Sequence, residues 1–187
     1  DVYKRQIKRV HLELGGKSAN LLCEDADFER AVRDGIEDAL RNSGQVCGGL
    51  TRMLVPRRRL AEAEEIAVAR AEQFALGDPF SVSTTLGPVS TAAARERIRG
   101  YIRSGLEEGG HMLTGGPDAP AGLDKGWFVR PTLFTGHNAM RIAQEEIFGP
   151  VVVVIPYDSE SEAIALANDS VYGLAAGVWC STAERAR

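Results

Sequence analysis

The sequence predicts an α/β domain with a mostly parallel sheet and flanking helices. Short apolar segments alternate with longer segments in which apolar residues recur every three or four positions, as strands and helices do in such folds. Residues 151–155 are purely aliphatic, which is typical of a strand covered on both faces in a parallel sheet. A length of 187 residues suits one domain with a substantial core.

The first half of the chain is predicted to hold two strands and two helices. Residues 19–23 form a buried strand, and Asp25 or Asp27 caps a helix that Gly44 ends. Residues 51–55, bounded by Pro56, form the next strand. The apolar helix faces consist of Phe28, Ala31, Val32, Ile36, Ala39 and Leu40, and of Leu60, Ala63, Ile66, Ala67, Ala71 and Phe74.

The second half alternates in the same way. We expect a loop at residues 76–90, strands at 111–113 and 178–180, a loop at 115–126 and an extended segment at 127–134. A third helix has Ile98, Tyr101, Ile102 and Leu106 on one face. Ser159 and Glu162 have the spacing of a capping box for a fourth helix.

Composition excludes several classes of protein. The chain is 44% hydrophobic and 26% charged, with a net charge of −4, as in a soluble globular protein. Its one basic cluster, Arg57 to Arg59, heads a helix, and its longest aliphatic run is far shorter than the ~20 residues of a membrane helix. We therefore expect neither nucleic acid nor membrane as a partner.

The three cysteines, Cys23, Cys47 and Cys180, are an odd number without CxxC spacing. This pattern argues against a disulfide framework or a zinc site, and it fits a reducing cytoplasm. We expect Cys23 and Cys180 to be structural and predict no metal site. The three histidines are widely scattered, which indicates neither a metal site nor a Cys-His dyad.

Both ends suggest a fragment. Ser181 and Glu184 have capping-box spacing, so a helix is expected to begin just before the last residue. Residues 1–6 match nothing in the resemblance described below, and we interpret them as an unmatched or non-native tail before a partial domain at residues 7–187.

Cys47 is the first candidate for chemistry. It lies in SGQVCGG at residues 43–49, between a predicted helix and a predicted strand. Glycines let the backbone approach a reacting centre, and neighbouring N–H groups favour the nucleophilic thiolate. The alternative is a small buried hydrophobic residue, the usual state of a free cysteine.

Glu13 is the second candidate. It lies in LELGGK at residues 12–17, and burial between Leu12 and Leu14 would make its carboxylate a stronger base. The alternative is a surface carboxylate paired with Lys17 or Lys8.

The segment EEIFGP at residues 145–150 places carboxylates and an aromatic ring at a Gly-Pro turn. A carboxylate such as Glu146 can accept both hydroxyls of a ribose, and Phe148 can pack on a flat ring. The alternatives are solvation of a helix end for the glutamates and core packing for Phe148.

Together these motifs resemble the aldehyde dehydrogenase superfamily. Seven blocks occur in the family's order: LELGGK at 12–17, NSGQVC at 42–47, GDP at 77–79, LGP at 86–88, FVRPT at 128–132, EEIFGP at 145–150 and residues 168–176. The resemblance covers residues 7–187. It implies the family's catalytic domain, without most of the cofactor-binding domain and the C-terminal oligomerisation segment.

The resemblance implies a role for each site residue. Cys47 corresponds to the nucleophile that forms a thiohemiacetal and then a thioester, and its backbone N–H to an oxyanion donor. Glu13 corresponds to the base that activates water. Glu146 corresponds to the carboxylate that holds the nicotinamide ribose, and Phe148 to the aromatic beside the nicotinamide. Leu14 and Gly15 fall where the family lines the nicotinamide pocket.

The implied activity is oxidation of an aldehyde to a carboxylic acid with NAD or NADP, by a protein that forms homo-oligomers when complete. Glu13 favours hydrolysis, because relatives that pass the acyl group to coenzyme A generally lack this base. An α/β unit of this length can bring Glu13 and Cys47 to the sheet edge where such folds usually bind ligands. Two alternatives are a reductase of activated acyl groups and a non-catalytic scaffold. We expect residues 1–187 alone to show no dehydrogenase activity.

Overall fold

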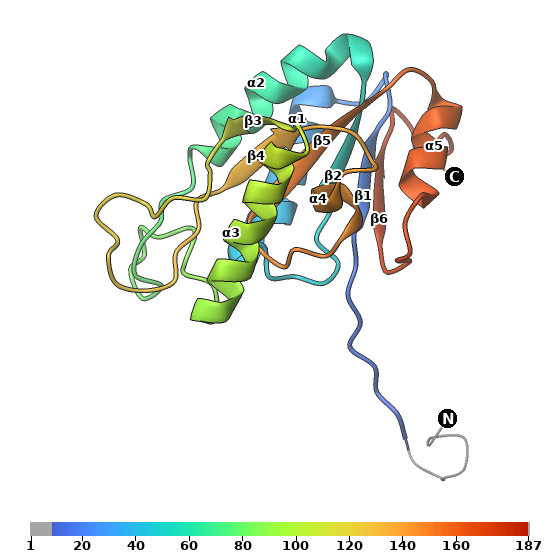
Figure 1. Ribbon diagram of the computed structural model, residues 1–187. Helices are drawn as coiled ribbons and strands as arrows, with labels where there is room; N and C mark the ends of the chain where they lie inside the picture. The colour runs from blue at the N-terminus through green and yellow to red at the C-terminus, as the bar shows by residue number, and fades with distance from the viewer. Residues whose placement is uncertain (1–8, 187) are drawn as a thin grey trace.

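The computed structural model describes residues 9–186, so the predicted tail at residues 1–6 lies outside the described part. A six-stranded sheet runs through the middle of the molecule, between two layers of helices (Figure 1). The strands are β1 (Ala19–Leu22), β2 (Arg52–Pro56), β3 (His111–Thr114), β4 (Thr132–Thr135), β5 (Val151–Tyr157) and β6 (Ala176–Trp179).

The strand order is β3-β4-β5-β2-β1-β6. All neighbours run parallel except β3, which pairs with β4 in the antiparallel direction. The predicted mostly parallel sheet is therefore confirmed. Val151 to Ile155 are all buried because β5 lies in the middle of the sheet, with helices over both faces.

Five helices cover the sheet: α1 (Phe28–Leu40), α2 (Leu60–Ala71), α3 (Ala92–Glu107), α4 (Arg141–Gln144) and α5 (Glu160–Asn168). The apolar residues of α1 and α2 share one core cluster with Val152 and Val154 of β5. The other face of β5, with Val151 and Val153, packs with α3, α4 and α5. These two clusters make a three-layer domain.

Local signals account for most helix boundaries. The side chains of Asp27 and Ser159 accept hydrogen bonds from backbone N–H groups in the first turns of α1 and α5, as the sequence predicts. Gly44 does not end α1. The helix stops at Leu40, and a 3₁₀ turn at Arg41–Gly44 follows, in which Asn42 and Ser43 adopt left-handed backbone angles.

Three further expectations differ from the structure. Leu106 is 42% exposed, because it lies near the end of α3 where the core no longer covers the helix. Residues 181–186 form bends and turns, so the helix expected after Ser181 is not formed. Arg57–Arg59 precede α2 as a 3₁₀ turn, and each of these arginines pairs with a carboxylate.

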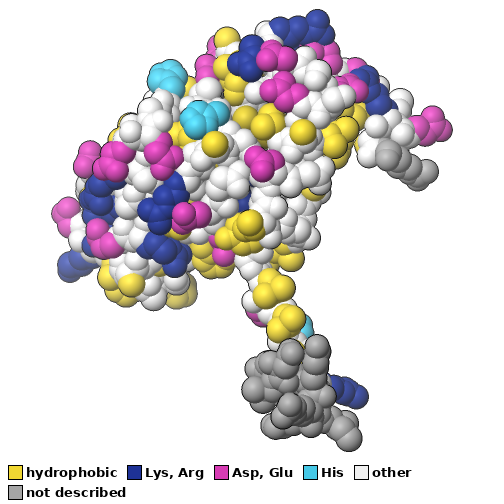
Figure 2. Space-filling view, turned by 45° about the vertical axis from the view of Figure 1, so that its right-hand side comes forward, with side chains coloured by type: hydrophobic (Ala, Val, Ile, Leu, Met, Phe, Trp, Pro, Cys, Tyr) yellow, Lys and Arg dark blue, Asp and Glu magenta, His cyan; other side chains and the backbone are white. Residues whose placement is uncertain are grey.

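The segment before β1 leaves the body of the domain as an extended chain (Figure 1). Hydrophobic side chains line this segment in Figure 2, where Val10, Leu12 and Leu14 are 48%, 66% and 61% exposed. Within residues 9–186, no helix combines the length and the apolar character needed to cross a membrane.

Candidate active site

Three segments carry the candidate residues, and each lies just before a parallel strand. Glu13 precedes β1, Cys47 precedes β2, and Glu146 and Phe148 precede β5. Because these three strands are parallel and adjacent, the segments meet at one edge of the sheet. The predicted meeting is thus correct, but the edge differs from the expected one: it is formed by the amino ends of the strands, whereas open α/β sheets usually bind ligands at the carboxyl ends.

A cavity of ≈ 610 Å³ opens at this edge. All six candidate residues line it, namely Glu13, Leu14, Gly15, Cys47, Glu146 and Phe148. Gln45, Val46 and Arg97 complete the lining. The cavity therefore places a thiol, two carboxylates, an aromatic ring and a guanidinium around one space.

Cys47 lies in a tight turn. The N–H of Gly49 donates to the carbonyl of Val46 at 3.1 Å, and the side chain of Cys47 is exposed. The residues before it are held in place: Ser43 Oγ donates to Gly87 O at 2.8 Å, and the side chain of Gln45 exchanges two hydrogen bonds with Ser90. The alternative interpretation of Cys47 as a buried hydrophobic residue is wrong.

Gly15 and Gly16 allow the three segments to approach one another closely. A Cβ at Gly15 would overlap the Glu146 carboxylate, and one at Gly16 would lie 2.6 Å from the carbonyl oxygen of Cys47. The N–H of Gly16 donates to Oε1 of Glu146 at 3.2 Å. The absence of side chains at this glycine pair thus lets Glu146 and Cys47 approach the backbone before β1.

The two adjacent glutamates have different environments. Glu145 accepts hydrogen bonds from Tyr101 and Arg141, and Arg141 lowers the pKa of the Glu145 carboxyl. It therefore matches the expected role of a glutamate at a helix end, whereas Glu146 lines the cavity. Phe148 also lines the cavity and has a φ of 54°, a left-handed conformation that costs about 1–2 kcal/mol in a residue with a side chain.

The expected burial of Glu13 is wrong. Its side chain is 82% exposed, and Leu12 and Leu14 are exposed as well. The Glu13 carboxylate is 2.6 Å from Nε2 of His11, which replaces the lysine partners considered from the sequence. Lys8, one of those lysines, lies outside the described residues.

Lys17, the other lysine, is only 2% exposed. Its ammonium group has no hydrogen-bond partner among residues 9–186. Burial and the nearby Arg52 lower the pKa of Lys17 to about 7, against the opposite effect of Glu146.

Sequence reasoning missed Arg97 and Gln45 as lining residues. Arg97 donates to the carbonyl of Ile147 at 3.3 Å, which fixes the guanidinium beside the segment that carries Glu146. Nothing in the sequence distinguishes it from Arg95, Arg99 and Arg103 of the same helix. Gln45 belongs to a motif block but has no chemical signature of its own.

Comparison with known proteins agrees with this geometry. The model of the aldehyde dehydrogenase family matches residues 2–187. A 3-succinoylsemialdehyde-pyridine dehydrogenase from Pseudomonas sp is 46% identical over 182 residues, which are 97% of this chain and 38% of that protein. The chain belongs to the aldehyde dehydrogenase family.

Solved structures of the family have the same fold. A variant of aldehyde dehydrogenase C from Pseudomonas syringae, in complex with NAD+ and octanal, is 48% identical with a TM-score of 0.94 over 97% of this chain and 38% of that one. An aldehyde dehydrogenase from Mycobacterium tuberculosis in complex with NAD+ is 44% identical with a TM-score of 0.90, over 92% of this chain and 36% of that one. The chain thus spans less than two fifths of the length of these relatives.

Proposed function

We propose that the complete protein containing this chain oxidises an aldehyde to a carboxylic acid with NAD+ or NADP+. One observation carries the proposal: a single cavity is lined by the thiol of Cys47 and the carboxylates of Glu13 and Glu146. The relatives crystallised with NAD+ support the choice of cofactor.

The lining residues fit the nicotinamide end of such a cofactor. The position of Gly15 leaves room that a Cβ would fill, and Glu146 presents a carboxylate suited to two ribose hydroxyls. Phe148 presents an aromatic ring that can pack on a flat heterocycle. Leu14 and Gly15 would line the wall of that subsite. When bound, the cofactor would accept a hydride from the substrate carbon.

The chain's own residues then divide the reaction into two parts. The Cys47 sulfur adds to the aldehyde carbonyl and gives a thiohemiacetal, whose oxyanion the Cys47 N–H can stabilise. Loss of hydride leaves a thioester on the same sulfur. Glu13 takes a proton from a water molecule, the resulting hydroxide attacks the thioester, and the acid and the free thiolate are released. Exposure of Glu13 at the cavity gives it access to water.

Steady-state and transient kinetics of the full reading frame test this proposal. With octanal and NAD+, NADH should form; Cys47→Ala should abolish the reaction. Glu13→Gln should retain a single burst of NADH, and acyl-enzyme should accumulate in the mass spectrum, because turnover falls by about 10²–10⁴-fold without the base. A wild-type protein that forms no NADH with any aldehyde would contradict the proposal.

Two controls separate the alternatives. An absolute requirement for coenzyme A would favour the reductase of activated acyl groups. Iodoacetamide labelling tests the scaffold alternative, but selectivity alone is insufficient because Cys47 is exposed while Cys23 is buried. The labelling rate of Cys47 must therefore exceed that of free glutathione at neutral pH, and an equal or slower rate would favour the scaffold.

A further inference from the structure

The other edge of the sheet brings two of the three cysteines together. Strands β1 and β6 are parallel neighbours, with Leu22 opposite Trp179. The next residues, Cys23 and Cys180, therefore emerge side by side where both strands end. The N–H of Cys23 donates to the carbonyl of Trp179 at 2.8 Å, which holds the two strand ends in this register.

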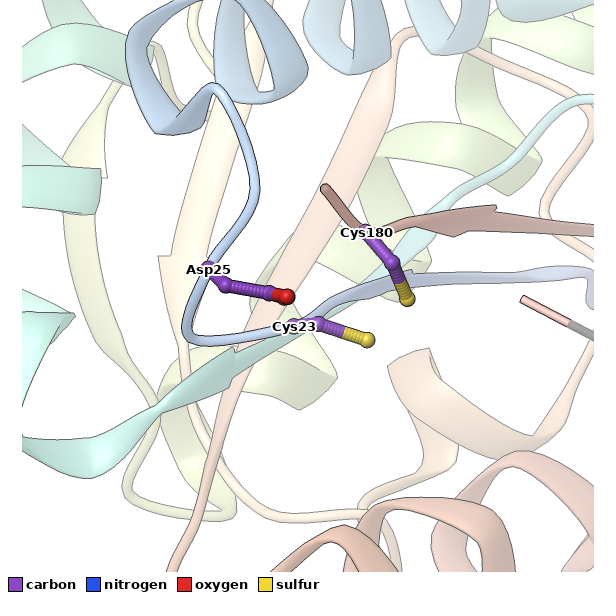
Figure 3. Close-up of side chains that lie close together, drawn as sticks. All are labelled: Cys23, Asp25 and Cys180. Atoms are coloured by element: carbon purple, nitrogen blue, oxygen red, sulfur yellow. The ribbon is translucent and has the colours of Figure 1, made fainter. Parts of the chain in front are cut away.

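Asp25 completes a group of three ligands. It lies in the turn between β1 and α1, and its carboxylate points toward the two sulfurs (Figure 3). One ligand atom from each of Cys23, Asp25 and Cys180 lies within 4.8 Å of the others. Sulfurs bound to one tetrahedral Zn²⁺ are about 3.8 Å apart, given Zn–S bonds of about 2.3 Å. Only small side-chain rotations are needed to reach this spacing.

A cationic group already occupies the surroundings of this cluster. Arg185 forms ion pairs with Asp25 and Glu160. Its side chain is 40% exposed and belongs to the turn at the end of the described chain, so a metal ion can displace it without disturbing the core. The contacts of Arg185 and Ser181 both reach Oδ2 of Asp25, which leaves Oδ1 able to bind a cation.

We propose that Cys23, Asp25 and Cys180 bind one Zn²⁺ or a similar thiol-seeking divalent cation. Two thiolates and one carboxylate form a donor set that Zn²⁺ accepts, with water as the fourth ligand. The ion would link the turn after β1 to the end of β6, at the edge of the sheet opposite the candidate active site. Residue spacing in the sequence could not indicate this site, because it depends on which strands are neighbours.

The protonation of Cys23 fits a site that needs a metal ion to ionise both thiols. Burial in the first place, and then the hydrogen bond with Cys180, raise the pKa of Cys23 to about 12. Without a cation the pair therefore keeps a proton at neutral pH. A divalent cation releases that proton when it binds, as is general for thiolate sites.

Co²⁺ titration tests the site directly. The full reading frame containing this chain, reduced and freed of metal, should bind Co²⁺ with a thiolate-to-cobalt charge-transfer band and strong visible bands of tetrahedral geometry. Zn²⁺ should abolish both. Cys180→Ser should remove the charge-transfer contribution of this site, and Asp25→Asn should weaken Co²⁺ binding at least about tenfold. Cys47→Ser is the matched control and should retain the full spectrum.

Circular dichroism of each variant checks that it folds, and the wild-type titration stands without any variant. Absence of the charge-transfer band in the reduced wild-type protein would overturn the proposal, even if air oxidation then links Cys23 to Cys180. A band that persists in Cys180→Ser, or that disappears in Cys47→Ser, would also overturn it, since the metal would then bind elsewhere.

Discussion

At the scale of single residues, Lys17 shows what burial of a charge costs this fold. Its ammonium group is 2% exposed, and its pKa is lowered from 10.5 to about 7. In the unfolded chain the lysine is protonated up to about pH 10.5, so between pH 7 and 10.5 the unfolded state binds more protons than the folded state. Stability therefore rises with pH in this window, and the full cost applies below pH 7.

We predict that Lys17→Met raises the free energy of unfolding at pH 7 by several kcal/mol, at most about 5 kcal/mol for a pKa change of this size. The gain should shrink between pH 7 and 9, a range that ends before Cys23 begins to ionise in the unfolded chain. Urea unfolding at pH 7, 8 and 9 measures this, with the exposed Lys125→Met as control. A gain that stays constant with pH would contradict the assignment.

At the scale of elements, Gly44 joins the Cys47 segment to the Glu146 segment. It has a φ of 67°, and a Cβ there would overlap the backbone of Gly149 and Pro150. Two separate constraints thus act on one residue: a left-handed backbone and a contact between two segments that approach the cavity from β2 and β5.

Gly44→Ala should lower the free energy of unfolding by about 1–2 kcal/mol for the left-handed backbone, plus about 1–3 kcal/mol for the overlap. Gly122→Ala is the matched control, because Gly122 has a φ of 73° but nothing within 4 Å of its built Cβ. Chemical denaturation of both variants separates the two effects. Equal losses would show that the contact with Gly149 contributes nothing.

The elements also show what sequence patterns can predict. Periodic apolar residues located α1, α2 and β5 correctly, because each buries one continuous face or strand. The four-residue α4 is too short for any periodicity to reveal. The burial of Glu13 was wrong because coverage of LELGGK depends on residues distant in sequence. The partnership of Cys23 and Cys180 follows from the β1–β6 pairing, which no local pattern encodes.

At the scale of the whole molecule, Arg52 connects parts that are far apart in the chain. This buried side chain donates to Lys17 O, Asn138 Oδ1, Leu166 O and Ala167 O, at 2.8 to 2.9 Å. It thereby ties the start of β1 and the loop before α4 to the end of α5. The planar fork of arginine suits this geometry, whereas the point charge of lysine does not.

Arg52→Lys should cost about 3–5 kcal/mol, the range for breaking a buried charged network. Arg57→Lys is the control, because its ion pair with Asp158 is exposed, and it should cost less than about 1 kcal/mol. Thermal and urea unfolding give both values. A similar small loss in both variants would mean that solvent replaces the lost hydrogen bonds of Arg52.

Strand β1 separates the two groups of reactive side chains. Its four residues span roughly 13 Å and are hydrogen-bonded on both sides, to β2 and to β6. A strand held in this way behaves as a stiff rod rather than a hinge, so strain applied at Cys23 has no soft element through which to reach Gly15. Loading the carboxyl end with a metal ion should therefore make the domain harder to unfold while the Michaelis constant for NAD+ stays the same.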